Sequence, residues 1–364
     1  MSGGNAVRGA DPGSPGRSPR TTPQSCSGPL SEHYDAALLD LDGVVYLGGT
    51  PIPYAAAALA GASGHDMKLA YVTNNASRTP HAIAAQLVAM GIPATAADIV
   101  TSAQAAAHVL ADRLPAGSPV LVVGGAGLRL AVRERGLRPV TSAAVGPLAV
   151  VQGYSPHIDY GLLAEAALAI NAGAWYVLSN ADRTLPTSRG PQPGNGSLAQ
   201  VLIHATGSQP VVAGKPEPPL HAESVERVGA KRPLVVGDRL DTDIEGAFRG
   251  GADSLLVLTG VTRPADLLLA PPAQRPCYVA VDLAGLNASH PEVTVADGRF
   301  GCGGWFAAAG ESGEAWLTVT GGGQWIDGLR ALCGAAWSAG PPPGSPEEQR
   351  RAAEVVLLGI GQPR

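Results

Sequence analysis

Cysteine is scarce in this chain of 364 residues. The four cysteines, Cys26, Cys277, Cys302 and Cys333, lie far apart, and no two of them have the paired spacing of a zinc site. Four cysteines are also too few for the disulfide framework of a small secreted domain. The pattern favours a protein of a reducing compartment, and we expect a cytoplasmic location.

Charge and long apolar runs are limited as well. Charged residues make up 15% of the chain and the formal net charge is −5, so no basic surface for nucleic acid or an anionic membrane is indicated. No apolar run of the chain approaches the ~18 residues of a membrane span, and the N-terminal stretch lacks the apolar segment of a signal peptide. We therefore expect neither a nucleic-acid partner nor membrane insertion, and a homo-oligomer is left open.

Both ends of the chain differ in composition from its middle. Residues 1–32 are predicted to form a disordered leader, because 16 of the first 30 residues are Gly, Pro or Ser. Four of the five tryptophans follow Asp282, together with a hairpin signal at Asp297-Gly298 and a helical apolar stripe over 325–337. We expect a small α/β module over 287–340, then a proline-rich linker and a terminal helix over 341–364.

Short apolar runs alternate with stretches of helical period from Tyr34 onward, which is typical of a parallel sheet with crossover helices. The runs lack polar alternation, so the strands are expected to be buried on both faces. One helix is predicted to start at Pro80 after a Thr79 cap and to stop at Gly91, and another to cover 162–170. The predicted strands are 36–39, 69–72, 120–123, 177–178, 211–213, 234–236, 254–258 and 278–281.

Polar residues follow three of these strands directly. In chain order they are Asp40 and Asp42; Thr73, Asn74 and Asn75; and Asp238, Asp241 and Asp243. Asp and Asn often start ordinary turns after strands, but three such groups, with Gly214-Lys215-Pro216 after a fourth strand, favour a functional crevice. In open α/β sheets that crevice lies beyond the carboxyl ends of the strands.

The carboxylates in these groups point to a metal and a phosphate. Asp40, Asp42 and Asp238 would repel one another at one site, and Mg²⁺ relieves such repulsion while keeping water ligands for phosphate oxygens. The ammonium of Lys215 and the hydroxyl and amides of 73–75 could bind the remaining phosphate oxygens. An aspartyl-phosphate would split the slow hydrolysis of a phosphate monoester into two steps. A second carboxyl group at Asp42 could protonate the leaving alkoxide and then activate water.

Four ordered motifs resemble those of the haloacid dehalogenase superfamily: Asp40-Leu41-Asp42-Gly43-Val44-Val45, Thr73-Asn74-Asn75-Ala76-Ser77-Arg78, Gly214-Lys215-Pro216 and Gly237-Asp238-Arg239-Leu240-Asp241-Thr242-Asp243. The Thr-Asn-Asn form and the long insert before the lysine are similar to the branch with a large C2-type cap. That branch includes NagD-like, p-nitrophenyl phosphatase, phosphoglycolate phosphatase and glycerol-3-phosphate phosphatase enzymes. Within it, the sequence most resembles the actinobacterial glycerol-3-phosphate phosphatases.

The resemblance implies a role for each motif residue. Asp40 would be the nucleophile and Asp42 the general acid and base. Mg²⁺ would be held by the Asp40 carboxylate, the Asp42 main-chain carbonyl and Asp238, with Asp243 behind these ligands. Phosphate would be bound by Thr73, Asn74, Asn75 and Lys215.

The resemblance also implies a Rossmann-like core over 33–98 and 206–286 and a specificity cap over 99–205. The Gly124-Gly125-Ala126-Gly127 stretch lacks the third glycine of a dinucleotide loop, so we interpret it as a turn of the cap. The residues Asn180, Asp182, Pro186, Gly194, Asn195 and Gly196 match a family stretch near the junction of cap and core.

The function expected on these grounds is Mg²⁺-dependent hydrolysis of a small phosphorylated metabolite, with glycerol 3-phosphate as the preferred substrate. Phosphoglycolate, a sugar phosphate or a nucleotide monophosphate are alternative substrates of the same chemistry. An alternative of another class is a phosphate-binding regulatory protein, in which the core serves the C-terminal module. The presence of both Asp40 and Asp42 favours the enzyme, because binding alone would not require both carboxyl groups.

Overall fold

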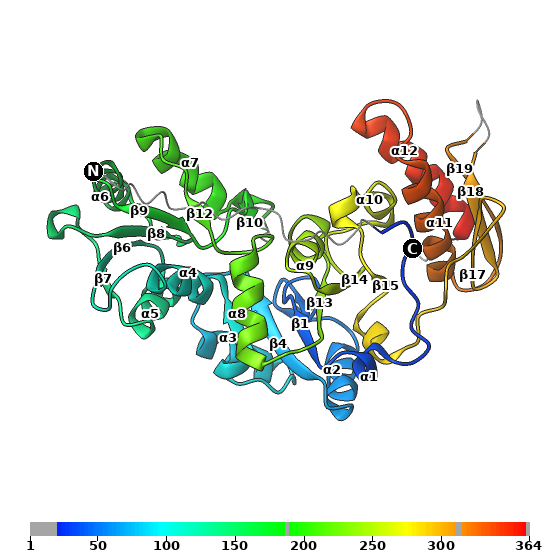
Figure 1. Cartoon of the computed structure of the whole chain (residues 1–364), viewed down its shortest axis with the longest axis horizontal. Helices are drawn as coiled ribbons and strands as arrows, with labels where there is room; N and C mark the ends of the chain where they lie inside the picture. The colour runs from blue at the N-terminus through cyan, green and yellow to red at the C-terminus, as the bar shows by residue number, and fades with distance from the viewer. Residues whose placement is uncertain (1–19, 186–188, 311–314, 362–364) are drawn as a thin grey trace, which may run out of the picture.

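The computed structural model describes residues 20–185, 189–310 and 315–361. They form three units side by side, with the core in the middle, the cap on one side and the C-terminal module on the other (Figure 1). The predicted α/β class and the parallel core sheet are confirmed. Among the described residues, no helix is long and apolar enough to cross a membrane.

The core contains a parallel sheet of six strands in the order β15-β14-β13-β1-β4-β5. Its central strands are apolar and buried on both faces, as predicted. Thr79 caps the predicted helix at Pro80 by accepting from the Ala82 N–H. The strands are β1 (Ala36–Leu39), β4 (Lys68–Thr73), β5 (Ile99–Thr101), β13 (Pro233–Gly237), β14 (Asp253–Val257) and β15 (Tyr278–Ala280), and the helices are α2 (Ala55–Gly64), α3 (Pro80–Ala89), α4 (Ser102–Ala111), α8 (Pro218–Val228), α9 (Glu245–Arg249) and α10 (Pro264–Leu268).

The cap contains a second parallel sheet, in the order β12-β9-β8-β6-β7. A small hairpin, β10 (Thr184–Leu185) and β11 (Gln192–Pro193), lies beside it, and β2 (Tyr46–Leu47) and β3 (Thr50–Pro51) form another on the core. The strands of the sheet are β6 (Pro119–Val123), β7 (Arg138–Val140), β8 (Ala149–Gln152), β9 (Trp175–Leu178) and β12 (Val211–Val212), and the helices are α5 (Ala126–Glu134), α6 (Tyr160–Asn171) and α7 (Asn195–Thr206).

The strand pairing in the two sheets places the boundaries between core and cap at other residues than the sequence predicts. Strand β5, placed in the cap by the boundary at 98/99, pairs with β4 of the core sheet, where Thr73 lies opposite Thr101. Strand β12, placed in the core by the boundary at 205/206, pairs with β9 of the cap sheet. Both strands are short and lie at sheet edges, so their membership depends on a partner that composition does not reveal.

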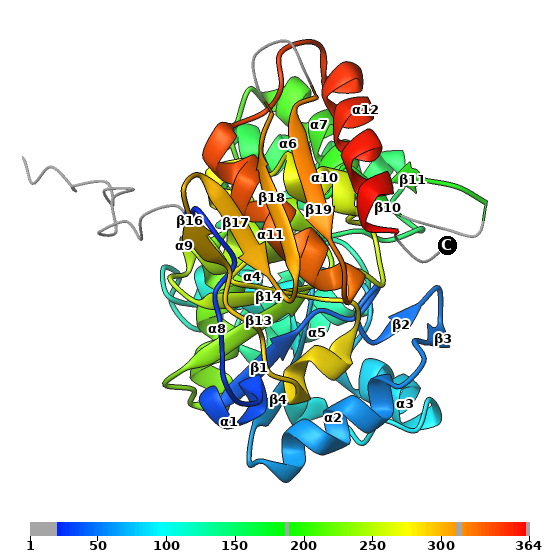
Figure 2. The ribbon, with the colours of Figure 1, turned by 90° about the vertical axis from the view of Figure 1, so that its right-hand side faces the viewer.

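The C-terminal module is an antiparallel sheet, β16 (Thr294–Ala296), β17 (Arg299–Cys302), β18 (Trp305–Ala309) and β19 (Leu317–Gly321), with helices α11 (Trp325–Ala339) and α12 (Pro346–Leu357) (Figure 2). The hairpin at Asp297-Gly298 and both helices are confirmed. However, α12 is not separated from the module, because Ala353 and Val356 share its buried apolar cluster. The same cluster includes Leu256 and Val279 of the core sheet, so the module packs directly on the core.

The prediction of a disordered leader is wrong for residues 20–32. Leu30, in helix α1 (Leu30–His33), is fully buried, and the Cys26 N–H donates to the His290 carbonyl at 2.9 Å. Arg20 forms an ion pair with Asp253 at 2.8 Å. These partners lie more than two hundred residues away along the chain, which is why local composition conceals the packing. The rest of the predicted leader, residues 1–19, lies outside the described residues.

Candidate active site

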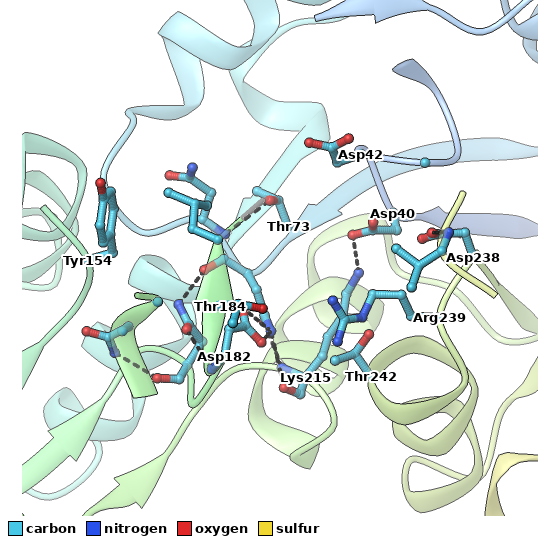
Figure 3. A pocket seen from close by; sticks show the side chains of 18 of the residues that line it. Asp40, Asp42, Thr73, Tyr154, Asp182, Thr184, Lys215, Asp238, Arg239 and Thr242 are labelled. Atoms are coloured by element: carbon cyan, nitrogen blue, oxygen red, sulfur yellow. Dashed lines mark hydrogen bonds and ion pairs between the residues drawn. The ribbon is translucent and has the colours of Figure 1, made fainter. Parts of the chain in front are cut away.

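The loops that follow β1, β4 and β13 meet the loop before α8 at one edge of the core sheet, beneath the cap (Figure 3). Here core and cap enclose a cavity of about 250 Å³. All the predicted site residues except Asp243 line this cavity, and Asp243 lies directly behind Lys215. The core lining includes Asp40, Asp42, Tyr46, Thr73, Asn74, Asn75, Lys215, Asp238, Arg239 and Thr242, and the cap lining includes Tyr154, Asn180, Asp182, Thr184 and Asn195.

Lys215 lies at the centre of the charged groups. Its Nζ donates to Asp40 Oδ1 at 2.6 Å, to Asp243 Oδ1 at 2.8 Å and to the Val72 carbonyl at 2.9 Å. Burial by itself lowers the pKa of Lys215, but the carboxylates of Asp243 and Asp40 outweigh it and hold this pKa above its usual value. The lysine is therefore a fixed cation that holds the Asp40 carboxylate in one orientation.

Asp40, Asp238 and Asp243 each offer a carboxylate oxygen, and these oxygens lie within 4.8 Å of one another. We call these three residues the acidic site. Burial, then Asp243 and Asp40, raises the pKa of Asp238 to about 8, and burial raises that of Asp40 to about 7 although Lys215 opposes it. Three clustered carboxylates with one lysine thus retain an excess of negative charge.

Asp238 shows most directly what the acidic site requires. Its side chain is fully buried, and Oδ2 accepts a hydrogen bond from the Val261 N–H at 2.6 Å. Within the part of the chain that the structure describes, the buried Oδ1 has no hydrogen-bond partner. Gly43 and Gly260 bring their backbones against this carboxylate, since a Cβ on either glycine would lie 2.5 or 2.0 Å from Oδ2. A buried, unpartnered carboxylate oxygen among other carboxylates fits a hard divalent cation.

Asp42 lies apart from this cluster, across the cavity from Lys215 (Figure 3). It precedes the β2–β3 hairpin, whose Tyr46 carbonyl accepts from the Gly43 N–H at 2.7 Å. Burial raises the pKa of the Asp42 carboxyl group, and a backbone N–H at Gly48 opposes this. A carboxyl group with a raised pKa that faces the cavity and is free of Lys215 is suited to proton transfer.

The side chains of Asn74 and Asn75 make contacts within the protein. Asn75 Oδ1 accepts from the Ser77 N–H and hydroxyl, both at 2.9 Å, and from the Arg78 N–H at 3.2 Å, which fixes the turn of the loop. Asn74 Oδ1 accepts from the Lys215 N–H at 2.8 Å. Thr73 Oγ1 accepts from the Asn75 N–H at 3.1 Å. The structure thus brings 73–75 to the cavity but directs both carboxamides to the surrounding loops.

Sequence reasoning missed several residues that line the cavity. Tyr154 and Thr184 come from the cap, and Arg239 comes from the loop after β13, where it binds Asp241 at 2.8 and 3.1 Å. Asp241 therefore forms an ion pair at the surface and lies outside the acidic site. The family stretch around 180–196 was the signal for the cap wall; of its residues, Pro186 lies outside the described part.

A buried carboxylate site held by a lysine at the carboxyl edge of a parallel sheet, beneath an inserted α/β cap, defines a hydrolase for phosphate esters. The chain belongs to the haloacid dehalogenase-like hydrolase family, whose model matches residues 37–138, and a second HAD-hydrolase-like model matches 212–286. The protein is a phosphatase of this family. Residues 302–356 match a third model, that of a GCN5-related N-acetyltransferase like domain.

Individual relatives agree with this assignment. The chain is 48% identical to D-glycerol 3-phosphate phosphatase of Mycobacterium tuberculosis. The aligned region has 267 residues and covers 73% of this chain and 75% of that protein. It is 39% identical to a 5′-nucleotidase of Bacillus subtilis, over 63% of this chain and 89% of the relative. The crystal structure of glycerol phosphate phosphatase from Mycobacterium tuberculosis in complex with magnesium superposes with a TM-score of 0.79, at 42% identity, covering 91% and 99% of the two chains.

Proposed function

We propose that this phosphatase hydrolyses glycerol 3-phosphate to glycerol and phosphate, with Mg²⁺ as its metal and Asp40 as its nucleophile. The observation that carries the proposal is the acidic site itself. Lys215 bridges two of its carboxylates, and the third, Asp238, has a buried oxygen without a partner among the described residues.

The Asp40 and Asp238 carboxylates, with the Asp42 main-chain carbonyl, would hold the metal. Bound Mg²⁺ supplies positive charge to the phosphate oxygens and relieves the repulsion among the carboxylates. The relative solved with magnesium supports this choice of metal. Asp243 would act through Lys215, which it contacts at 2.8 Å.

The reaction would proceed in two steps on this chain's residues. The Asp40 carboxylate oxygen attacks phosphorus and the bond to the glycerol oxygen breaks, while Asp42 donates its proton to that oxygen. Asp42, now a carboxylate, removes a proton from water, which attacks the aspartyl-phosphate and releases phosphate and free Asp40. Lys215 holds the attacking carboxylate, and the Thr73 hydroxyl with backbone N–H groups of 73–75 would bind phosphate oxygens.

The cap wall of the cavity supports a small hydroxylated leaving group. The cap lining includes the neutral polar residues Tyr154, Asn180, Thr184 and Asn195 together with Asp182, and the cavity measures about 250 Å³. The similarity to a D-glycerol 3-phosphate phosphatase supports the same substrate. The competing substrates are a nucleotide, as the Bacillus relative suggests, phosphoglycolate and sugar phosphates.

We also infer that the core consists of residues 33–111 and 214–286 and the cap of 112–213, since β5 pairs in the core sheet while β12 and the Ala213 N–H pair with β9 of the cap. The cytoplasmic location remains a prediction.

A substrate panel tests the proposal. The purified protein is stripped of metal with EDTA, supplied with Mg²⁺, and assayed for phosphate release from glycerol 3-phosphate, 2-phosphoglycolate, glucose 6-phosphate and adenosine 5′-monophosphate. We expect kcat/KM to be highest for glycerol 3-phosphate, by about tenfold or more, and activity to require the added metal. A higher kcat/KM for any other ester overturns the substrate, and full activity without metal overturns the mechanism.

A further inference from the structure

Asn74 is the point at which cap, core and the Lys215 loop meet. Its main-chain carbonyl accepts from the Ser102 hydroxyl at 2.6 Å and from Asn180 Nδ2 of the cap at 2.7 Å. Its Nδ2 donates to the Lys215 carbonyl at 3.2 Å, while Oδ1 accepts from the Lys215 N–H at 2.8 Å. The side chain thus holds both backbone groups of Lys215.

Asp182 supplies the remaining contact of Asn74 from the cap. Asn74 Nδ2 lies 3.2 Å from one carboxylate oxygen of Asp182 and 3.3 Å from the other. The main chain of Asp182 is itself fixed, because its N–H donates to Asn180 Oδ1 at 3.2 Å and its carbonyl accepts from the Gly196 N–H at 2.9 Å. A Cβ on Gly194 would lie 2.3 Å from that carbonyl, so the loop packs too closely for a side chain. Asp182 therefore has a defined position in the cap.

The chain crosses from cap to core next to these residues. The Ala213 N–H donates to the Leu178 carbonyl of the cap sheet at 2.9 Å, and Lys215 follows two residues later. Between them, Gly214 is pressed against both domains, since a Cβ there would lie 2.5 Å from Asn74 Oδ1 and 2.5 Å from the Ser179 carbonyl. The backbone that leads into Lys215 is therefore in contact with the cap and with Asn74 of the core at once.

We infer that Asp182 is a positioning residue, which acts through Asn74 to hold Lys215 on Asp40 when the cap covers the core. The inference rests on the proposed roles of Asp40 and Lys215. Lys215 reaches Asp40 at 2.6 Å from a backbone that Asn74 fixes on both sides. Removal of the Asp182 carboxylate leaves the Asn74 amide without its cap partner, and the lysine loop loses one of its restraints.

Asp182 also lines the cavity, so a direct contact with the leaving group is the rival role. The two roles predict different kinetics. A positioning residue affects the phosphate chemistry and lowers the rate by the same factor for every ester. A residue that recognises the leaving group affects glycerol 3-phosphate and leaves p-nitrophenyl phosphate nearly unchanged.

The experiment compares Asp182→Ala, Asp182→Asn and wild type with both esters at saturating Mg²⁺. We expect Asp182→Ala to lower kcat for each ester by a similar factor of about 10 to 100. Asp182→Asn retains an acceptor oxygen for Asn74 and is expected to stay within about threefold of wild type. Glu134→Ala, which removes an exposed carboxylate from α5 of the cap outside the cavity lining, is the matched control and should change kcat for p-nitrophenyl phosphate by less than about twofold. Asp182→Ser replaces the alanine variant if that one does not fold.

A double-variant cycle completes the test. Because Asp182 acts through Asn74, Asn74→Ala with Asp182→Ala should be no slower than Asn74→Ala alone. Multiplying losses, or a loss confined to glycerol 3-phosphate, overturn the inference. Unchanged kcat in Asp182→Ala with both esters overturns it as well. Wild-type protein that hydrolyses neither ester would refute the proposed function instead, so the two failures are distinguishable.

Discussion

Two clusters of ionisable residues in this protein, each with a buried carboxylate, differ in how their charge is balanced. In the acidic site, three carboxylates share Lys215, and an oxygen of Asp238 is buried without a partner among the described residues. In the second cluster, Glu223 of α8 binds Arg135 at 2.7 Å, Arg227 at 2.5 Å and His108 at 2.6 Å. We call this second group the Glu223 brace; it joins α8 of the core to α4 and to the end of α5.

The pKa values of the two clusters shift in opposite directions. Burial, with the charges of Asp243 and Asp40, raises the pKa of Asp238 to about 8, and the opposing charge of Arg239 does not reverse this shift. Burial raises the pKa of Glu223 too, but hydrogen bonds from His108 and Arg227 outweigh it and hold this pKa below its usual value. Acidic residues in proximity are therefore not enough to indicate a metal site. A shortage of positive charge at the site distinguishes a place for a cation from a structural brace.

The largest expected effect separates the two clusters by activity. Asp40→Asn replaces a carboxylate oxygen of the proposed nucleophile, and we expect kcat for p-nitrophenyl phosphate to fall by about 10³-fold or more. Glu223→Gln is the matched control from the brace and should stay within about threefold of wild type. Stopped assays of phosphate release, with circular dichroism to verify folding, measure both. Near-wild-type turnover by Asp40→Asn would exclude Asp40 as the nucleophile.

The second largest expected effect separates the acidic site from the Glu223 brace by their response to metal and pH. The folded-state pKa values of Asp40 and Asp238, about 7 and 8, lie above the ordinary carboxyl range, so the metal-free protein should lose stability as pH rises from about 4 through 8. Mg²⁺ should therefore raise Tm more at pH 8 than at pH 5. At one hundred times Kd the gain is about 2.7 kcal/mol.

Differential scanning fluorimetry with and without Mg²⁺ measures this response. Asp238→Asn should abolish it while Glu223→Gln retains it. An equal Mg²⁺ shift at both pH values would contradict the charge balance assigned to the acidic site.

The smallest effect concerns the stability that the brace provides. Glu223→Gln removes a charge that accepts three charge-assisted bonds, from groups that are partly exposed at 24–35%. We expect a loss of about 2 kcal/mol in the free energy of unfolding. Urea denaturation at pH 7.5 measures it, and Glu226→Gln, at an exposed neighbour, is the control that should cost less than about 0.5 kcal/mol. Equal losses in the two variants would show that the brace contributes little.

The sequence predicts residues of the site better than it predicts their contacts. Asp40, Asp238 and Lys215 could be found because each follows an apolar strand, and parallel strands bring such ends together. The contacts of Asn74 could not be found, because its partners Asp182 and Lys215 lie 108 and 141 residues away. The sequence analysis also did not predict the burial of Leu30 or the strand β8. The reason is related, because a short apolar segment does not reveal which part of the chain it packs against.

The chain passes from cap to core just after β12, and this position decides where the caps of two family members could be exchanged. If caps were exchanged at the 205/206 boundary, β12 with Val211 and Val212 would stay with the core of one parent, whereas β9 would come with the cap of the other. The two strands that pair in the cap sheet would then come from different parents. The break that preserves both the sheet and the lysine loop lies between Ala213 and Gly214, with the Asn74 segment taken from the same parent as Lys215. We expect homologous chimeras cut at that point to keep the contact between Lys215 and Asp40 under a new cap.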